Sequence, residues 1–177
     1  MKFSGDSTWV ISSGDGGTFA LFVRDALGIS TPAADSIPRL TPPVQRLTGL
    51  LYPPELVEDW DRWWRDCSTM GHGREPVGLP VELREAYYEW GAFTTPENTQ
   101  RRDDIRISFS NSVHELVTEL EQELRRRPVF KLDVVQIPVE GQFWRRLKHD
   151  RVLVSEELMA SRNVIAPLES VIRELAR

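Results

Sequence analysis

The N-terminal part of the chain alternates apolar and polar positions in two short runs that flank a glycine-rich stretch. The apolar residues are Trp9 and Ile11 before the glycines and Phe19, Leu21 and Val23 after them. Alternation with a period of two is typical of strands, and Asp-Gly favours the positive φ angles of a tight turn. The pattern therefore predicts an N-terminal β-hairpin over residues 8–24. The alternative is a helix from about Thr18 to Gly28, where the glycine would end it.

Proline dominates the next segment, because six of the twelve prolines fall within residues 31–54. Each proline fixes its own φ and disfavours helix in the residue before it. The segment nevertheless contains apolar residues that can pack, namely Leu40, Val44, Leu47, Leu50, Leu51 and Tyr52. We therefore expect a connector that wraps around the protein, with at most a short helix near its end.

Helical spacing governs residues 55–91. Apolar residues recur at intervals of three and four in a first stripe of Leu56, Trp60, Trp63, Trp64 and Cys67, and in a second stripe of Leu83, Ala86, Tyr87 and Trp90. Glycines follow each stripe, and Pro80 suits the first turn of the second one. This spacing predicts a Trp-rich pair of helices.

The C-terminal part, residues 104–177, contains both the alternation that is typical of strands and the spacing of three and four that is typical of helices. Ile105, Ile107 and Phe109 alternate with polar residues and predict a strand, which a helix from Ser112 to the arginines before Pro128 follows. Further strands are predicted at residues 130–137 and 151–155, and helices begin at residue 156 and at residue 167. The stretch Phe-Trp-Arg-Arg-Leu between those strands could form either a strand or a helix by its spacing.

These elements together predict an α+β fold in a single domain over residues 1–177. The domain is expected to contain a mixed sheet of about five strands, with the N-terminal hairpin, packed by four to five helices.

Composition adds limits on environment and partners. The chain has 177 residues, a net charge of −5 and one cysteine, Cys67. A lone cysteine forms no internal disulfide and no multi-cysteine zinc site, and the N-terminus lacks the features of a signal peptide, so we expect a cytoplasmic protein. No apolar run has the length of a membrane span, and the acidic balance disfavours nucleic acid.

The glycine-rich stretch Ser-Gly-Asp-Gly-Gly-Thr lacks the marks of a phosphate loop. Thr18 follows Gly17 directly, without the lysine that a Walker-type loop requires, and Ala20 stands where the dinucleotide fingerprint would place a glycine. We therefore predict a plain turn and no cofactor.

Catalytic candidates are few. Cys67 and His72 are five residues apart and could meet as nucleophile and base, although a buried thiol beside a solvated histidine is the simpler interpretation. A hydrolase or transferase site would have to combine His72, His114 and Asp103 or Asp104. The spacing of the histidines predicts no metal site.

Six tryptophans are the least ordinary feature of the composition. Trp60, Trp63 and Trp64 crowd one side of a predicted helix, where they either pack on the sheet or form a hot-spot surface. Trp144, Arg145 and Arg146 begin the most basic stretch of the chain. These six residues form the candidate interaction surface.

The leading functional hypothesis is a cytoplasmic protein-binding or regulatory module without catalysis, which acts on a protein partner or as a homodimer. The alternative is the small hydrolase or transferase built on His72, His114 and Asp103 or Asp104.

Overall fold

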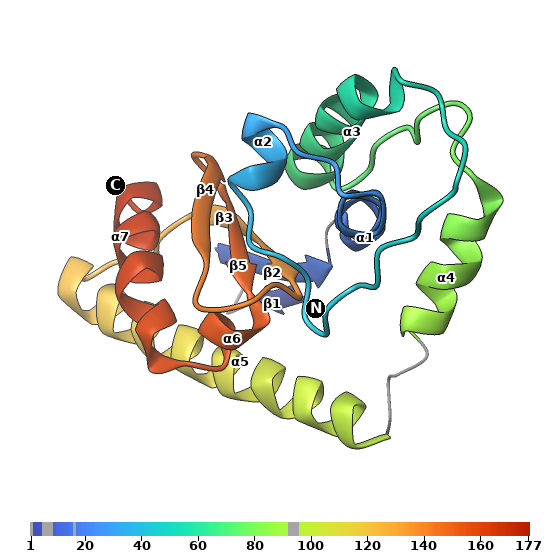
Figure 1. Ribbon diagram of the computed structural model, residues 1–177. Coiled ribbons are helices and arrows are strands. Elements are labelled where there is room, and N and C mark those ends of the chain that lie inside the picture. Colours follow the sequence, from blue (N-terminus) through green and yellow to red (C-terminus); the bar gives the residue numbers. More distant parts are fainter. Residues whose placement is uncertain (1, 5–8, 16, 92–95) are drawn as a thin grey trace.

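The computed structural model describes residues 2–4, 9–15, 17–91 and 96–177 (Figure 1). The chain is an α+β protein built on one mixed sheet, with the strand order β1-β2-β3-β5-β4. The strands are β1 (Lys2–Ser4), β2 (Trp9–Asp15), β3 (Phe130–Ile137), β4 (Trp144–Lys148) and β5 (Arg151–Ser155). The three central strands β2, β3 and β5 are parallel, whereas β1 and β4 pair antiparallel at the two edges.

Helices cover both faces of this sheet. The α-helices are α1 (Thr18–Leu27), α2 (Pro32–Asp35), α3 (Leu56–Met70), α4 (Val81–Gly91), α5 (Pro96–Leu124), α6 (Glu156–Met159) and α7 (Ile165–Leu175), with a 3-10 turn η1 (Arg162–Val164) before α7. Among the described residues, no helix combines the length and the apolar composition that crossing a bilayer requires.

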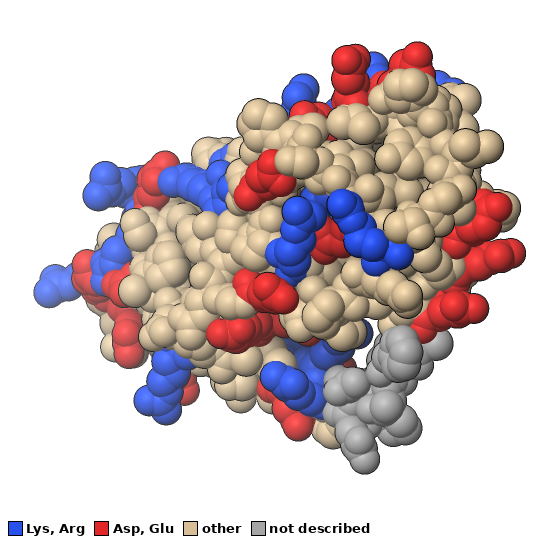
Figure 2. All heavy atoms as spheres, viewed as in Figure 1, with Lys and Arg blue, Asp and Glu red and all other residues tan. Residues whose placement is uncertain are grey.

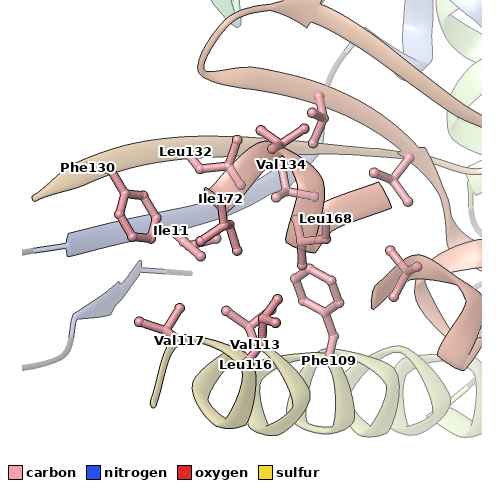
Figure 3. Packing of buried hydrophobic residues seen from close by; sticks show 14 of the residues in the cluster. Ile11, Phe109, Val113, Leu116, Val117, Phe130, Leu132, Val134, Leu168 and Ile172 are labelled. Carbon is pink, nitrogen blue, oxygen red and sulfur yellow. The ribbon is translucent and has the colours of Figure 1, made fainter. Parts of the chain in front are cut away.

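Two hydrophobic cores result from the alternation of side chains along the strands. Leu132 and Val134 of β3 face α5 and α7, and Figure 3 shows Val113 and Leu116 of α5 pointing towards this side of the sheet. Val135, like Ile137, faces the opposite core, which α1 and α3 cover. A strand buried on both faces needs apolar residues in both registers, and residues 130–137 have them, so the sequence is consistent with the central place of β3.

The predicted N-terminal hairpin over residues 8–24 is wrong. The first strand, β2, is present, but its neighbours are β1 and β3, and the chain continues into α1 at Thr18. Every residue from 20 to 26 in α1 is buried, so the helix is apolar on nearly all sides and lacks the polar stripe that would reveal its period. The alternative prediction holds instead, since Gly28 ends α1 with a left-handed φ of 65°.

The predicted strand at Ile105, Ile107 and Phe109 is also wrong. These residues lie inside α5, which is continuous from residue 96 to residue 124. Phe109 is buried while Ile107 is exposed, so the two face different ways, as a helix requires. The predicted strands at residues 130–137 and 151–155 are confirmed as β3 and β5, and the ambiguous stretch at residues 143–147 overlaps β4.

A buried ion pair holds the proline-rich connector against α1. Arg24 is fully buried, and its guanidinium group donates to the carbonyl oxygens of Ala34, Ile37 and Pro38 at 2.8 to 3.1 Å. Its Nε also donates to the carboxylate of Asp25 at 2.7 Å. Residues 34–40 therefore wrap around the end of α1, as the connector prediction requires. The charged pair adds to the apolar packing of Ala34, Ile37 and Leu40 in the same core.

Candidate functional site

The three tryptophans of α3 belong to the core. Trp60, Trp63 and Trp64 are all buried, and Trp60 donates from Nε1 to the carbonyl oxygen of Ala20 at 2.6 Å. The rings of Trp60 and Trp64 stack with their centroids 6.1 Å apart, and Trp64 lies so close to Gly17 that a Cβ there would be 2.7 Å from its ring. Their indoles pack under α1, where a partner cannot reach them. The three tryptophans therefore belong to the core and not to an interaction surface.

The basic stretch on β4 is engaged with its own chain. Trp144 is half-buried against the core on the α7 side. Arg145 donates to the hydroxyl and the carbonyl oxygen of Ser36 at 2.9 and 2.6 Å, while Arg146 binds both carboxylate oxygens of Glu174 at 2.6 and 2.9 Å. These contacts tie the β4 edge to the connector and to α7, which leaves fewer donors for a partner than the sequence suggests.

The residues of the hydrolase or transferase alternative lie apart. His72 is exposed in the loop after α3, on one face of the sheet, whereas Asp103, Asp104 and His114 belong to α5 on the other face. Along α5, Asp103 and His114 are separated by about 16 Å, at 1.5 Å per residue. The structure does not bring these side chains into one site.

Cys67 does not have the environment of a nucleophile. Its side chain is buried, and the loop at Gly73 closes over it so tightly that a Cβ there would lie 2.9 Å from Sγ. Burial and the nearby carboxylates of Asp66 and Glu75 raise the pKa of the thiol, although a hydrogen bond with Trp63 acts the other way. A raised pKa reduces the thiolate fraction at neutral pH, which is the opposite of activation.

Exposed apolar side chains gather instead around α4. Leu51 is 95 % exposed, Val77 78 %, Val81 63 % and Tyr88 69 %, with Tyr52 at 37 %. We call these five residues the α4 surface. Large apolar side chains exposed side by side mark binding surfaces more often than scattered ones do.

The helix geometry of α4 explains why Val81 and Tyr88 face outward together. They are seven residues apart, which is two turns, and so lie on the same side. The opposite side packs on α1, where Tyr87 contacts the ring of Phe22 at a centroid distance of 5.3 Å. Trp90 continues this inner side and donates from Nε1 to the carbonyl oxygen of Pro42 at 3.0 Å. The apolar stripe predicted for α4 is therefore the buried side of the helix. Val81 and Tyr88 of the α4 surface lie on its exposed side.

Two loops extend this apolar area beside α4. Gly78 has a φ of 79° and lies so close to the ring of Pro53 that a Cβ on it would be 2.8 Å away. This contact brings residues 51–53 next to residues 77–78, and the ion pair between Glu75 and Arg84 fastens the second loop to the helix. These contacts place the two loops beside the first turns of α4, where Val81 lies, and Tyr88 follows two turns further along the same side of the helix.

The charge around the α4 surface is acidic. Glu82, Glu85 and Glu89 are exposed on α4, and Arg84 is paired with Glu75. Figure 2 shows acidic side chains following one another along the margin where Figure 1 places α4, whereas blue and red are mixed elsewhere. An apolar area with an acidic rim fits a partner that offers apolar side chains with lysine or arginine beside them.

Comparisons of this chain with protein-family models, with curated protein sequences and with solved structures find no match. Within the part of the chain that the structure describes, no group of three or more His, Cys, Asp or Glu is placed to hold a metal ion.

Proposed function

We propose that this protein is a protein-binding or regulatory module without catalysis, which binds its partner through the α4 surface. The observation that carries the proposal is that α4 and the two loops packed beside it expose five large apolar side chains. The dispersal of the predicted catalytic residues over both faces of the sheet favours binding over the hydrolase or transferase alternative. The single, buried Cys67 accords with a cytoplasmic protein.

The partner is a different protein with a basic, apolar binding region. A symmetric homodimer through the α4 surface would place Glu82, Glu85 and Glu89 of one copy against the same residues of the other, because the same patch faces itself across a two-fold axis. Like charges brought together in this way oppose association. The same acidic rim repels the phosphates of nucleic acid.

Capture from an extract of the source organism tests this proposal. The wild-type protein is compared with the double variant Val81→Lys/Tyr88→Lys, which removes apolar contacts and reverses part of the charge. The control is Val129→Lys, because Val129 is 74 % exposed but lies in the loop before β3, outside the α4 surface. We expect one protein to be retained by the wild type and by the control, lost with the double variant, and released more easily as salt concentration rises.

Two results would overturn the proposal. One is equal retention of every captured protein by the wild type and the double variant. The other is self-association in sedimentation velocity that the double variant abolishes, because it would make a second copy the occupant of the surface. Melting temperatures of all three proteins, measured in parallel, ensure that a loss of binding is not a loss of folding.

A further inference from the structure

A cavity of about 1100 Å³ lies at the edge of the sheet where the parallel strands end. Gly17 and Thr18 follow β2, Pro138 and Val139 follow β3, and Glu156 follows β5, and all of them line it. Ligands of sheets with parallel strands commonly bind outside the carboxyl ends of those strands. The volume is slightly above the roughly 300 to 1,000 Å³ that ligand pockets usually have.

The α5 wall of this cavity carries arginines where the helix would otherwise bury apolar residues. Arg102, Arg106 and Phe109 lie on one side of α5 at spacings of four and three, and Phe109 is part of the core. Arg101 lines the cavity beside them. Ile105 lies between Arg102 and Arg106 and also lines the cavity, so the inner side of α5 carries both apolar and cationic residues where it reaches the cavity.

The charges of the cavity leave room for an anion. Three arginines and two glutamates line it. Nε of Arg102 lies 3.3 Å from a carboxylate oxygen of Glu156, and a guanidinium nitrogen of Arg106 lies 3.9 Å from a carboxylate oxygen of Asp103 on the same helix. Arg101 makes no hydrogen bond or ion pair with any residue that the structure describes. Guanidinium groups bind carboxylate and phosphate through two parallel hydrogen bonds, so Arg101 is the lining arginine best placed to take an anionic group.

The wall opposite α5 is planar and apolar. Tyr87 and Trp90 stack with their centroids 6.0 Å apart and an interplanar angle of 23°, and both line the cavity together with Pro42 and Pro43. The hydrogen bond from Trp90 to Pro42 holds the indole in place. Rigid aromatic walls bind planar rings with little loss of side-chain entropy.

From this arrangement we infer that the cavity binds a small organic anion, a phosphate or carboxylate group carried on a planar ring. Arg101, with Arg102 beside it, holds the anionic group, and the Tyr87–Trp90 wall holds the ring. The first turn of α1 at Gly17 and Thr18, which has no side-chain cap, adds backbone N–H donors to the site. This site is distinct from the α4 surface and does not depend on the proposed protein partner.

Calorimetric titration with four probes tests the inference. AMP carries a ring and a phosphate, indole-3-acetate carries a ring and a carboxylate, adenosine carries only the ring, and inorganic phosphate carries only the anion. We expect AMP, indole-3-acetate or both to bind at least about tenfold more tightly than adenosine and inorganic phosphate, because only the combined probes use both walls. Which of the two binds identifies the anionic group.

Variants locate the binding. The double variant Arg101→Gln/Arg102→Gln should lower the affinity for the probe that binds by about tenfold or more, as expected when charged hydrogen bonds are lost. Arg65→Gln, which changes an exposed arginine on α3, should leave binding unchanged, as should Val81→Lys/Tyr88→Lys. The inference is overturned if no probe binds at millimolar concentration, if inorganic phosphate binds as tightly as the ring-bearing anions, or if the arginine double variant binds like the wild type while melting at the same temperature.

Discussion

At the scale of single residues, the buried pair of Arg24 and Asp25 ties the proline-rich connector to α1. Arg24 sits in an apolar helix, yet every hydrogen bond it makes reaches either its neighbour or the connector. Asp25 in turn accepts from the backbone N–H of Leu40 at 2.8 Å and from Arg39 at 2.9 Å. Two adjacent residues of α1 thus bind residues 34–40 of the connector. Arg24 binds carbonyl oxygens of this segment, and Asp25 accepts from its N–H and guanidinium donors.

We predict that Arg24→Met lowers the free energy of unfolding by about 3 kcal/mol or more, because it leaves the Asp25 carboxylate and three carbonyl oxygens without their buried donor. The matched control is Arg62→Met, which removes an exposed pair with Asp59 and should cost less than about 1 kcal/mol. Urea denaturation of the three proteins measures both changes. Equal effects of the two substitutions would refute the structural role of Arg24.

The same pair predicts a pH dependence. Burial alone would raise the pKa of Asp25, but hydrogen bonds from Arg24, from the backbone of Leu40 and from Arg39, together with the charge of Arg24, hold the pKa below its ordinary value of 3.8. A carboxyl with a lowered pKa in the folded state stabilises the protein above its unfolded-state pKa and loses that contribution as the pH falls through the folded-state pKa. Asp25→Asn should therefore be less stable than the wild type at neutral pH.

The stability difference between wild type and Asp25→Asn should stay constant down to mildly acidic pH and narrow only below pH 3.8. Denaturant melts at a series of pH values measure it. A difference that widens on acidification would have the wrong sign for this mechanism.

At the scale of elements, the sequence predicts two kinds of element correctly. One is a helix with one apolar and one polar side, and the other is a short strand that is rich in apolar residues. The stripes of α3 and α4, the central strand β3 and the short strand β5 all follow from periodicity. The predicted helix start at residue 156 is also correct, and the hydroxyl of Ser155 caps α6 there by accepting from the N–H of Leu158 at 3.2 Å.

The two wrong elements fail for physical reasons. The helix α1 is buried almost all round, so its apolar residues contain a period of two as well as one of 3.6. In the N-terminal half of α5 the inner side carries Arg102 and Arg106 as well as Ile105, so the apolar stripe is interrupted by charged residues. Local pattern is therefore ambiguous at the places where the tertiary structure departs from a simple amphipathic element.

Substitutions within α5 distinguish helix from strand at this point. If residues 105–109 were a strand, Ile107 and Phe109 would share a side and contribute alike. Because they lie in a helix, we predict that Phe109→Ala costs about 3 to 5 kcal/mol of stability, whereas Ile107→Ala costs less than about 0.5 kcal/mol. Urea denaturation measures both, and similar losses for the two variants would contradict the helix.

At the scale of the whole molecule, the arrangement of layers explains why the α4 surface stays open. The sheet is covered on one face by α5 and α7 and on the other by α1 and α3, and α4 packs outside α1 at the margin of the molecule (Figure 1). A helix in this outer position has only one side to bury. Whether the outer side of α4 is covered depends on where the fold places the helix. Sequence periodicity therefore predicts the buried stripe of α4 but does not show that Val81 and Tyr88 are exposed.

The functional candidates that the sequence offers share this limitation. Trp60, Trp63 and Trp64 are conspicuous by residue type, yet the fold uses all three as core. The cavity at the ends of the parallel strands joins residues from distant parts of the chain, from Gly17 to Glu157, and no local motif announces it. Residue type indicates which side chains can act, whereas position in the fold decides which of them a partner or ligand can reach.

The most direct test of the central claim, that the protein acts by binding a partner at the α4 surface, is site-specific photocrosslinking in the native cell. The probe is Tyr88→p-benzoylphenylalanine, which keeps an aromatic ring at the exposed position, and the control is Val129→p-benzoylphenylalanine at an equally exposed site outside the surface. We predict one crosslinked adduct with a different, basic protein from position 88 and no such adduct from position 129. No specific adduct from position 88, or the same adducts from both positions, would contradict the claim.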